Sequence, residues 1–221
     1  MQVKLISYSQ SPLNSAQGFT EIQDLITYCA RVSNPSNQTN TDTAEKLINY
    51  LLKHKHFSPF EMVNLCLEIE TTRDISRQIL RHRSFSFQEF SQRYADPVTE
   101  LKFVLREARL QDKTNRQNSI TTSDNSLIEA WKIRQQKVIN TARAEYEWAI
   151  ANGIAKECAR VILPEGNMMT RMYVNGTLRS WIHYIEVRSG NGTQSEHIEV
   201  ALKCADVISA VFPSITKCNI I

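Results

Sequence analysis

One segment of fourteen residues concentrates the side chains that bind phosphates and stabilise anions. It runs from Arg81 to Tyr94, reads RHRSFSFQEFSQRY, and is called the signature segment below. Three consecutive cationic or titratable side chains open it, and three serines, a carboxylate and a fourth cation, Arg93, follow. Arginine binds phosphate through two charge-assisted hydrogen bonds from its planar guanidinium. The segment therefore indicates a site for an anionic small molecule, with a solvated basic helix end as the simpler alternative.

The overall composition is that of an ordinary globular protein. The chain has 221 residues, of which 42% are hydrophobic and 22% charged, enough apolar material for a single domain over residues 1–221. Its formal net charge of +3 is mild, which suits an anionic substrate and gives no reason to expect nucleic acid. No apolar run reaches the length of a membrane span, and the first residues lack a signal-peptide core. We expect a cytoplasmic protein with no membrane partner.

The cysteines give no sign of metal or disulfide chemistry. They are odd in number and scattered, at Cys29, Cys66, Cys158, Cys204 and Cys218. None has the paired spacing of zinc or redox sites, so we expect no metal. Buried, reduced thiols are the expectation for a cytosolic protein.

The signature segment must be positioned by the elements that precede it. From Val63 to Glu70 apolar and polar residues alternate, which predicts a half-buried strand. Thr71 or Thr72 can then cap a helix that carries Ile75, Ile79 and Leu80. This helix delivers Arg81-His82-Arg83 at its C-terminal end, where the helix dipole favours cations. Further upstream the pattern predicts a short first strand, a helix over 19–30, and a helix from Asp42 to about residue 55.

The elements after the signature segment are mostly helical. Residues 111–126 are polar and predict an inserted surface loop, and a long helix follows from about 126 to 152 and stops at Gly153. A shorter helix carries Arg160, a strand covers 168–174, and a helix buries Leu178, Trp181, Ile182 and Ile185. Thr193 and Glu196 form a capping-box pattern that opens a final helix, whose predicted inward face is Ile198, Ala201, Leu202, Ala205 and Ile208.

These elements predict a mixed α+β fold. We expect a small, mostly antiparallel sheet flanked by long helices, with the polar inserted loop near 111–126. The chain has no Gly-x-Gly-x-x-Gly fingerprint, so the fold is not expected to be a Rossmann fold.

The order of motifs resembles that of the flavin-dependent thymidylate synthases. The signature segment matches the pattern Arg-His-Arg, two residues, Ser, four residues, Ser, one residue, Arg, and Gln88 stands where the family more often has asparagine before the glutamate. The other matching segments are His56–Glu61, Arg77-Gln78, Arg160–Pro164, Gly176–Ser180, His183 and Arg188. They cover most of the chain between Ala30 and Glu199.

The resemblance implies an enzyme that methylates dUMP to dTMP in de novo thymidylate biosynthesis. It implies FAD as cofactor, 5,10-methylenetetrahydrofolate as one-carbon donor, NADPH as the source of electrons for the flavin, and a homotetramer with shared active sites. Arg188 would stabilise negative charge on the uracil ring as the catalytic residue. The other implied dUMP-binding residues are Gln78, Ile79, Leu80, Arg81, Glu89, Phe90, Ser91, Gln92, Arg93 and Arg160. For Arg160, a helix-surface ion pair with Glu157 is the structural alternative.

The resemblance also implies a set of flavin-binding residues. These are His56, Ser58, Arg81, His82, Arg83, Glu89, Thr177, Leu178, Arg179 and His183. A packing role is as common as a functional one for a histidine such as His183. Ser91 is expected to bind substrate and not to act as a nucleophile, because the sequence shows no base to activate it.

Two other classes of function fit parts of the sequence. A nucleic-acid-binding module would use the arginines of the signature segment on phosphates, with Phe85, Phe87 and Phe90 stacked on bases. A nucleotide sensor would keep the binding residues without turnover. A bound flavin would favour the enzyme over the nucleic-acid-binding module.

Overall fold

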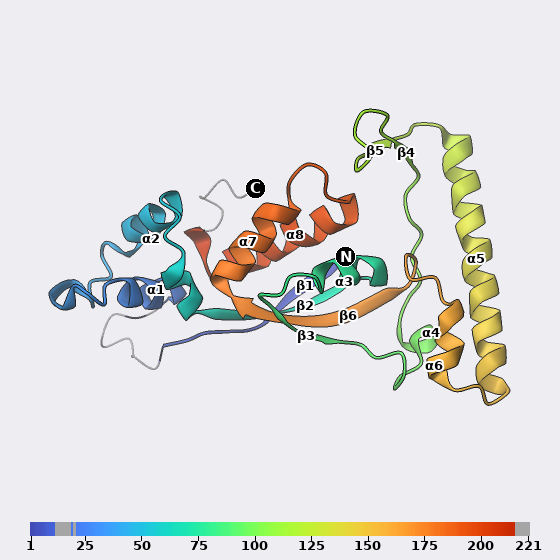
Figure 1. Ribbon diagram of the computed structural model, residues 1–221, viewed down its shortest axis with the longest axis horizontal. Coiled ribbons are helices and arrows are strands. Elements are labelled where there is room, and N and C mark those ends of the chain that lie inside the picture. Colours follow the sequence, from blue (N-terminus) through green and yellow to red (C-terminus); the bar gives the residue numbers. More distant parts are fainter. Residues whose placement is uncertain (12–18, 20, 215–221) are drawn as a thin grey trace.

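The centre of the structure is a four-stranded antiparallel sheet (Figure 1). The computed structural model describes residues 1–11, 19 and 21–214. The strands lie in the order β1 (Gln2–Tyr8), β2 (Asn64–Thr72), β6 (Met169–Thr177) and β3 (Ser86–Glu89). Every neighbouring pair among these strands is antiparallel. The predicted α+β fold with a small antiparallel sheet is therefore confirmed.

One face of the sheet forms the main core. In β2 the buried residues Leu65, Leu67 and Ile69 alternate with polar ones, as the sequence predicts. Leu67 pairs with Val174 of β6, so both point to the same side. Because side chains alternate between faces along a strand, this register gathers the apolar residues of both central strands on one face.

Three helices cover that face: α3 (Arg73–Ile79), α7 (Leu178–Arg188) and α8 (Ser195–Ser209) (Figure 1). All four residues predicted to face inward from α7 are buried. Gly176, at the end of β6, lies so close to Phe85 that an added Cβ would come within 2.3 Å of its ring. The close approach of β6 to the signature segment therefore requires glycine at this position. We call this sheet with its three helices the central body.

Two shorter helices lie at one end of the sheet, α1 (Ile22–Ala30) and α2 (Ala44–Lys53). Short 3-10 helices span Pro35–Asn37 and Ser58–Met62. The predicted helix over 19–30 begins only at Ile22, and residue 20 lies outside the described residues. The predicted start at Asp42 is wrong by two residues, because α2 begins at Ala44 after Thr43.

The segment from residue 90 to 163, called the outer arm, extends away from the central body (Figure 1). It holds α4 (Pro97–Glu100), β4 (Arg109–Gln111), β5 (Ser119–Thr121), α5 (Asn125–Ala151), α6 (Lys156–Ala159) and a 3-10 helix (Arg160–Ile162). The predicted long helix is confirmed. Gly153 follows it with φ +77°, a left-handed conformation that favours glycine just after a helix.

The polar stretch near 111–126 is partly regular. The prediction of an inserted loop was incomplete, because β4 and β5 pair as an antiparallel hairpin across it. The Asp112 side chain accepts hydrogen bonds from the backbone N–H groups of Thr114 and Asn115, which closes the turn. Local side-chain hydrogen bonds of this kind stabilise turns without apolar residues.

The start of the last helix also differs from the prediction. No side-chain cap is found at Gln194, which precedes α8, so the capping box of Thr193 and Glu196 is wrong. Glu196 instead forms ion pairs with Arg106 and Arg109 of the outer arm. The buried face is rotated as well: Ala201, Ala205 and Ile208 are buried as predicted, but His197, Val200 and Cys204 replace Ile198 and Leu202.

The cysteines are more exposed than predicted. Cys204 is buried, Cys29 and Cys66 are partly buried, and Cys158 is exposed. Cys218 lies outside the described residues. No helix within the described ranges combines the length and the hydropathy needed to cross a membrane.

Candidate functional site

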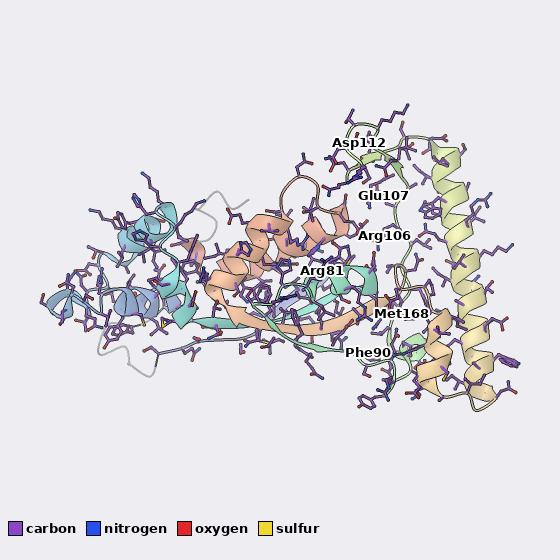
Figure 2. The ribbon with its side chains drawn as sticks, viewed as in Figure 1. Arg81, Phe90, Arg106, Glu107, Asp112 and Met168 are labelled. Atoms are coloured by element: carbon purple, nitrogen blue, oxygen red, sulfur yellow. The ribbon has the colours of Figure 1, made fainter. Side chains whose placement is uncertain are left out.

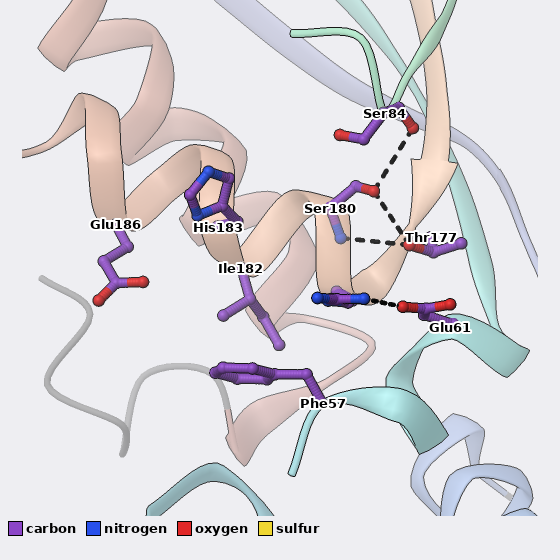
Figure 3. A pocket seen from close by; sticks show the side chains of 9 residues that line it. Phe57, Glu61, Ser84, Thr177, Ser180, Ile182, His183 and Glu186 are labelled. Atoms are coloured by element: carbon purple, nitrogen blue, oxygen red, sulfur yellow. Dashed lines mark hydrogen bonds and ion pairs between the residues drawn. The ribbon is translucent and has the colours of Figure 1, made fainter. Parts of the chain in front are cut away.

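A cavity of about 580 Å³ lies at the beginning of α7 (Figure 3). It contains three of the residues predicted to bind flavin, Thr177, Arg179 and His183. The rest of its lining is Phe57, Glu61, Ser84, Ser180, Ile182 and Glu186. Leu178 is fully buried, so its side chain belongs to the core below.

Hydrogen bonds hold the wall of this cavity in place. The Thr177 hydroxyl accepts a hydrogen bond of 3.2 Å from the backbone N–H of Ser180 and thereby caps α7. The Ser180 hydroxyl donates to the backbone oxygen of Ser84, at 3.4 Å. Arg179 forms an ion pair with Glu61 (Figure 3). The signature segment is therefore fixed against the start of α7, and one wall of the cavity is charged while Phe57 and Ile182 are apolar.

Arg81 and Arg83 follow α3 and are exposed. Within the described ranges, neither guanidinium takes part in a hydrogen bond or an ion pair. Arg77, one turn earlier, is by contrast paired with Glu89 and Glu165. Two uncommitted cations side by side are suited to bind an anionic group such as a phosphate.

His82, between these arginines, points inward and orients Arg188. The Nε of Arg188 donates a hydrogen bond of 2.9 Å to Nε2 of His82. Burial, the charge of Arg188 and nearby His183 lower the pKa of His82 to about 4. His82 is thus neutral at physiological pH and accepts the hydrogen bond, which fixes the guanidinium at the end of α7.

The predicted residues of α3 differ in what they offer a ligand. Gln78 is half-buried, and its side chain is bonded to Gln194 and His197. Ile79 is buried and Leu80 partly buried, both in the apolar core. Ile79 could therefore contact a substrate only through its backbone atoms.

Glu89 already has a full set of partners. Its carboxylate accepts hydrogen bonds from the hydroxyls of Ser76, at 2.9 Å, and Thr170, at 3.0 Å. Arg73 and Arg77 each lie 3.5 Å from it. The group links α3, β3 and β6, so its structural role is evident while its predicted contact with ligands remains a prediction.

The other predicted dUMP-binding residues lie in the outer arm, at a distance from Arg188. Figure 2 shows Phe90 beside α4 and well separated from Arg81. Gln92 is buried and bonded to the sulfur of Met168, at 3.1 Å. Ser91 accepts a hydrogen bond from the backbone N–H of Arg93, at 3.3 Å.

The ion pair between Arg160 and Glu157, which was the structural alternative for Arg160, is not formed among the described residues. Glu157 pairs with Arg93, at 3.1 Å, and not with Arg160. Within the described residues, the Arg160 guanidinium has no ion pair. Arg160 thus stays available to an anion, whereas Arg93 would first have to leave an exposed ion pair that contributes little energy.

Two predicted flavin-binding residues lie beside the cavity but do not line it. His56 and Ser58 are exposed, and the His56 ring is 6.0 Å from that of Tyr50. Their neighbours Phe57 and Glu61 do line the cavity. The segment His56–Glu61 therefore does contribute to the cavity, through Phe57 and Glu61 in addition to the predicted His56 and Ser58 beside it.

The aromatic residues that a nucleic-acid-binding module would need for stacking on bases are not open to solvent. Phe85 is 7% exposed, and its ring centroid lies 4.5 Å from that of Trp181 in the core. Phe87 and Phe90 are also partly buried. Aromatic side chains that bind single strands must present an open face to the bases, and these do not.

The fold and the site define a class of protein: an α+β protein without a Rossmann fold, with a partly apolar cavity at the start of α7 and with exposed Arg81 and Arg83, unpaired within the described ranges, in the segment that contributes Ser84 to its wall. Comparison with known proteins gives the family. Residues 17–214 match the family described as "Thymidylate synthase complementing protein". A probable flavin-dependent thymidylate synthase of Paramecium bursaria Chlorella virus 1 is 48% identical over 217 residues, 98% of each chain. The flavin-dependent thymidylate synthase of Synechocystis sp. is 46% identical over 215 residues, 97% of each chain.

A solved structure has the same fold. It is that of a UMP/dUMP methylase, PolB, from Streptomyces cacaoi, bound with 5-Br dUMP. The TM-score is 0.79 at 23% identity, and the match covers 98% of this chain and 93% of that chain. The chain belongs to the flavin-dependent thymidylate synthase family, and the resemblance inferred from the signature segment is confirmed.

Proposed function

We propose that this protein methylates dUMP to dTMP, with 5,10-methylenetetrahydrofolate as one-carbon donor and reduced FAD as hydride donor. NADPH is the proposed reductant of the flavin, and the proposed role is de novo thymidylate biosynthesis in the cytoplasm. The observation that carries the proposal is the Arg188–His82 pair, beside two uncommitted arginines in a chain of this family. The whole of residues 1–221 is proposed to act as one domain.

The cavity residues fit a flavin. Phe57 and Ile182 offer apolar surface to a flat ring, and Arg179 with the uncommitted Arg81 and Arg83 offers charge to a diphosphate. The flavin, when bound, supplies hydride transfer. The chain's own contribution is to hold and orient the ring system, and we assign that role to the predicted set that lines or borders this cavity.

Arg188 is the proposed catalytic residue. Its guanidinium is held by neutral His82, so its remaining N–H groups keep one direction before substrate arrives. Donors that are already aimed at the place where negative charge develops stabilise a transition state most effectively. We infer that Arg188 stabilises negative charge on the uracil ring and so activates it.

No enzyme nucleophile is proposed. Among the described residues, the contact of the Ser91 hydroxyl is with the backbone N–H of Arg93, and no base is bonded to it. A serine that attacks needs such a base. Ser91, with Gln92, Arg93 and Arg160, is instead proposed to bind dUMP.

We also propose a homotetramer with shared active sites. Within one chain, Arg188 ends α7 of the central body, whereas Arg93 and Arg160 belong to the outer arm (Figure 1). Large apolar side chains on α5 are exposed, among them Trp131, Ile133 and Trp148. Association of several copies would bury these residues and bring the arm of one copy to the central body of another.

An anaerobic reaction tests the proposed function. The purified protein is loaded with FAD, reduced, and mixed with dUMP and 5,10-methylenetetrahydrofolate. The expected result is reoxidation of the flavin, seen by its absorption, together with dTMP seen by chromatography, and neither when dUMP is omitted. A protein that takes up no added flavin, or whose reduced flavin yields no dTMP, would refute the proposal.

A further inference from the structure

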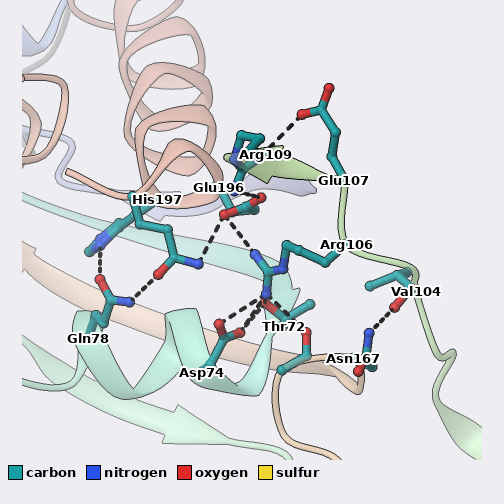
Figure 4. A network of polar contacts seen from close by, with 12 residues as sticks. Thr72, Asp74, Gln78, Val104, Arg106, Glu107, Arg109, Asn167, Glu196 and His197 are labelled. Atoms are coloured by element: carbon teal, nitrogen blue, oxygen red, sulfur yellow. Dashed lines mark hydrogen bonds and ion pairs between the residues drawn. The ribbon is translucent and has the colours of Figure 1, made fainter. Parts of the chain in front are cut away.

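A chain of hydrogen bonds links the buried side of α7 to the last turn of α3 through α8, and Figure 4 shows its part from His197 to Glu196. The Nε2 atom of His197 lies 3.1 Å from the hydroxyl of Tyr184, and its Nδ1 atom lies 3.1 Å from Oε1 of Gln78. The Nε2 of Gln78 donates to Oε1 of Gln194, at 2.9 Å. The Nε2 of Gln194 donates to Oε2 of Glu196, at 3.0 Å.

The hydrogen bonds in this chain can run in only one donor-to-acceptor direction. An ionised carboxylate only accepts hydrogen bonds, so Gln194 must turn its NH2 group to Glu196 and its oxygen to Gln78. Gln78 must then turn its NH2 group to Gln194 and its oxygen to His197. It follows that His197 carries its proton on Nδ1 and accepts from Tyr184 at Nε2.

Charges on both sides keep the two ends in these states. Burial opposes ionisation of Glu196, yet the hydrogen bonds from Arg109 and Gln194 and the charge of Arg106 hold its pKa below the usual value. Burial, together with the charge of Arg188 and the nearness of His82, lowers the pKa of His197 to about 3. His197 is therefore neutral, with one N–H to give.

The chain leaves one group of Gln78 unused. Its side-chain oxygen accepts a hydrogen bond from His197, and one hydrogen of its NH2 group is donated to Gln194. The second hydrogen of the NH2 group takes no part in this chain of hydrogen bonds. Gln78 is half-buried and lies three residues before Arg81, on the same side of the helical turn. It thus presents a donor beside the uncommitted arginine.

We propose that His197 is a positioning residue, which with Gln194 fixes the amide of Gln78 so that an N–H meets an acceptor oxygen of the nucleotide. This inference rests on the proposed function and on the dUMP-binding role of Gln78. Without the donor at His197, the oxygen of Gln78 loses its partner and the amide rotates. Its oxygen then faces the oxygens of the nucleotide and repels them.

Two substitutions of His197 separate positioning from packing. In His197→Asn the side-chain amide lies near the place of Nδ1, so its NH2 group still donates to Gln78. In His197→Gln the amide reaches the place of Nε2, toward Tyr184, and the donor to Gln78 is lost. Both replace a buried imidazole by a neutral amide, so each controls for the lost packing of the other.

The expected difference lies in nucleotide affinity. His197→Gln should raise the KM for dUMP about 3- to 10-fold, the size of one uncharged hydrogen bond, with a smaller change in kcat. His197→Asn should restore most of the wild-type KM. Equal KM values for the two variants would overturn the proposal, because a packing role alone does not distinguish them.

Measurements without turnover keep this test separate from that of the proposed function. Equilibrium dialysis should show that His197→Gln binds dUMP more weakly than His197→Asn, and that His197→Asn binds it about as tightly as the wild type. The ¹⁵N spectrum of the histidine side chains in the wild-type protein should show His197 protonated at Nδ1, with its signal assigned by its loss in His197→Asn. Protonation at Nε2 would overturn the proposed orientation, whether or not the protein forms dTMP.

Discussion

Arg188 and Gln78 of the central body differ from Arg93 and Arg160 of the outer arm in how they are held. In the central body, His82 holds Arg188 and the chain from Glu196 to Tyr184 holds Gln78, so these groups have fixed partners before any ligand binds. In the outer arm, Arg160 has no ion pair among the described residues, and Arg93 has only an exposed one, with Glu157.

The difference lies in the partners, because Arg188, Gln78 and Arg160 are all partly buried themselves. Gln78 is bonded to His197, which is fully buried, and a buried polar group without a partner costs free energy. Arg93 is exposed, so water solvates it and it bears no such constraint. The central body is therefore suited to orient a reacting ring, and the outer arm to contribute charge to binding. Substitutions in the two regions should then affect different kinetic constants.

The largest effect is expected from Arg188→Ala. Loss of one preorganised donor at a developing negative charge costs roughly 3–4 kcal/mol, so kcat should fall by about two to three orders of magnitude. Flavin binding should stay largely intact. The measurement is dTMP formation at saturating dUMP, with flavin content read from the absorption spectrum.

Arg171→Ala is the matched control for this prediction. Arg171 lies on β6, and its guanidinium pairs with Glu70 of β2 and takes no part in the contact that holds Arg188. It should therefore retain turnover. Wild-type turnover in Arg188→Ala, or an equal loss in both variants, would contradict the catalytic role of Arg188.

Arg93→Ala should affect binding more than turnover. A charge-assisted contact to phosphate is made alike in the ground state and the transition state, and it is worth about 1.5–3 kcal/mol. The KM for dUMP should therefore rise roughly 10- to 100-fold, while kcat changes less. Steady-state kinetics with varied dUMP give both constants.

Glu157→Gln sharpens the same prediction, because it removes the carboxylate beside Arg93 but keeps the guanidinium. The KM for dUMP should stay at the wild-type value or decrease. If Glu157→Gln raised the KM as much as Arg93→Ala, the ion pair itself would be the functional unit, and a direct contact of Arg93 with phosphate would be refuted.

Ser91→Ala should have a smaller effect again. A hydroxyl that only forms a hydrogen bond near the substrate contributes about 0.5–3 kcal/mol, so activity should remain easy to detect. A nucleophile replaced by alanine would leave only background turnover. The kinetics are combined with a mass-spectrometric search for a nucleotide adduct on the wild type. An inactive variant that still binds flavin and dUMP, with an adduct on Ser91, would reverse the assignment.

The sequence predicted those parts of the molecule that depend on local pattern. Alternation identified β2, the apolar face identified α7, and glycine marked the end of α5 at Gly153. The spacing of the signature segment identified the family. In each case neighbouring residues carry the information, because side-chain periodicity follows backbone geometry.

What the sequence did not predict depends on contacts between distant segments. Glu196 fits a capping box, yet two arginines of the outer arm draw its carboxylate into ion pairs with them. His197 is a single histidine in an amphipathic helix, and its partners Tyr184 and Gln78 come from two other helices. Only the folded chain brings these groups together, so no local pattern in the sequence marks His197.

The smallest expected effect concerns acid stability, and it tests the burial on which the comparison rests. The folded-state pKa of His197 is about 3, below its ordinary value, so the unfolded chain binds more protons between about pH 6.5 and pH 3. The free energy of unfolding should therefore fall as the pH decreases through this range.

The His197→Asn variant cannot take up this proton, so its unfolding should be less sensitive to pH, by about one proton between pH 5 and pH 4. Arg93 of the outer arm is exposed and should contribute little to this difference. Urea unfolding at several pH values measures the slope, and Tyr184→Phe, which keeps the imidazole, should behave as the wild type does. If the unfolding free energy of His197→Asn had the same pH slope as that of the wild type, His197 would titrate alike in the folded and the unfolded chain. The conclusion that His197 is buried and neutral in the folded protein would then be refuted.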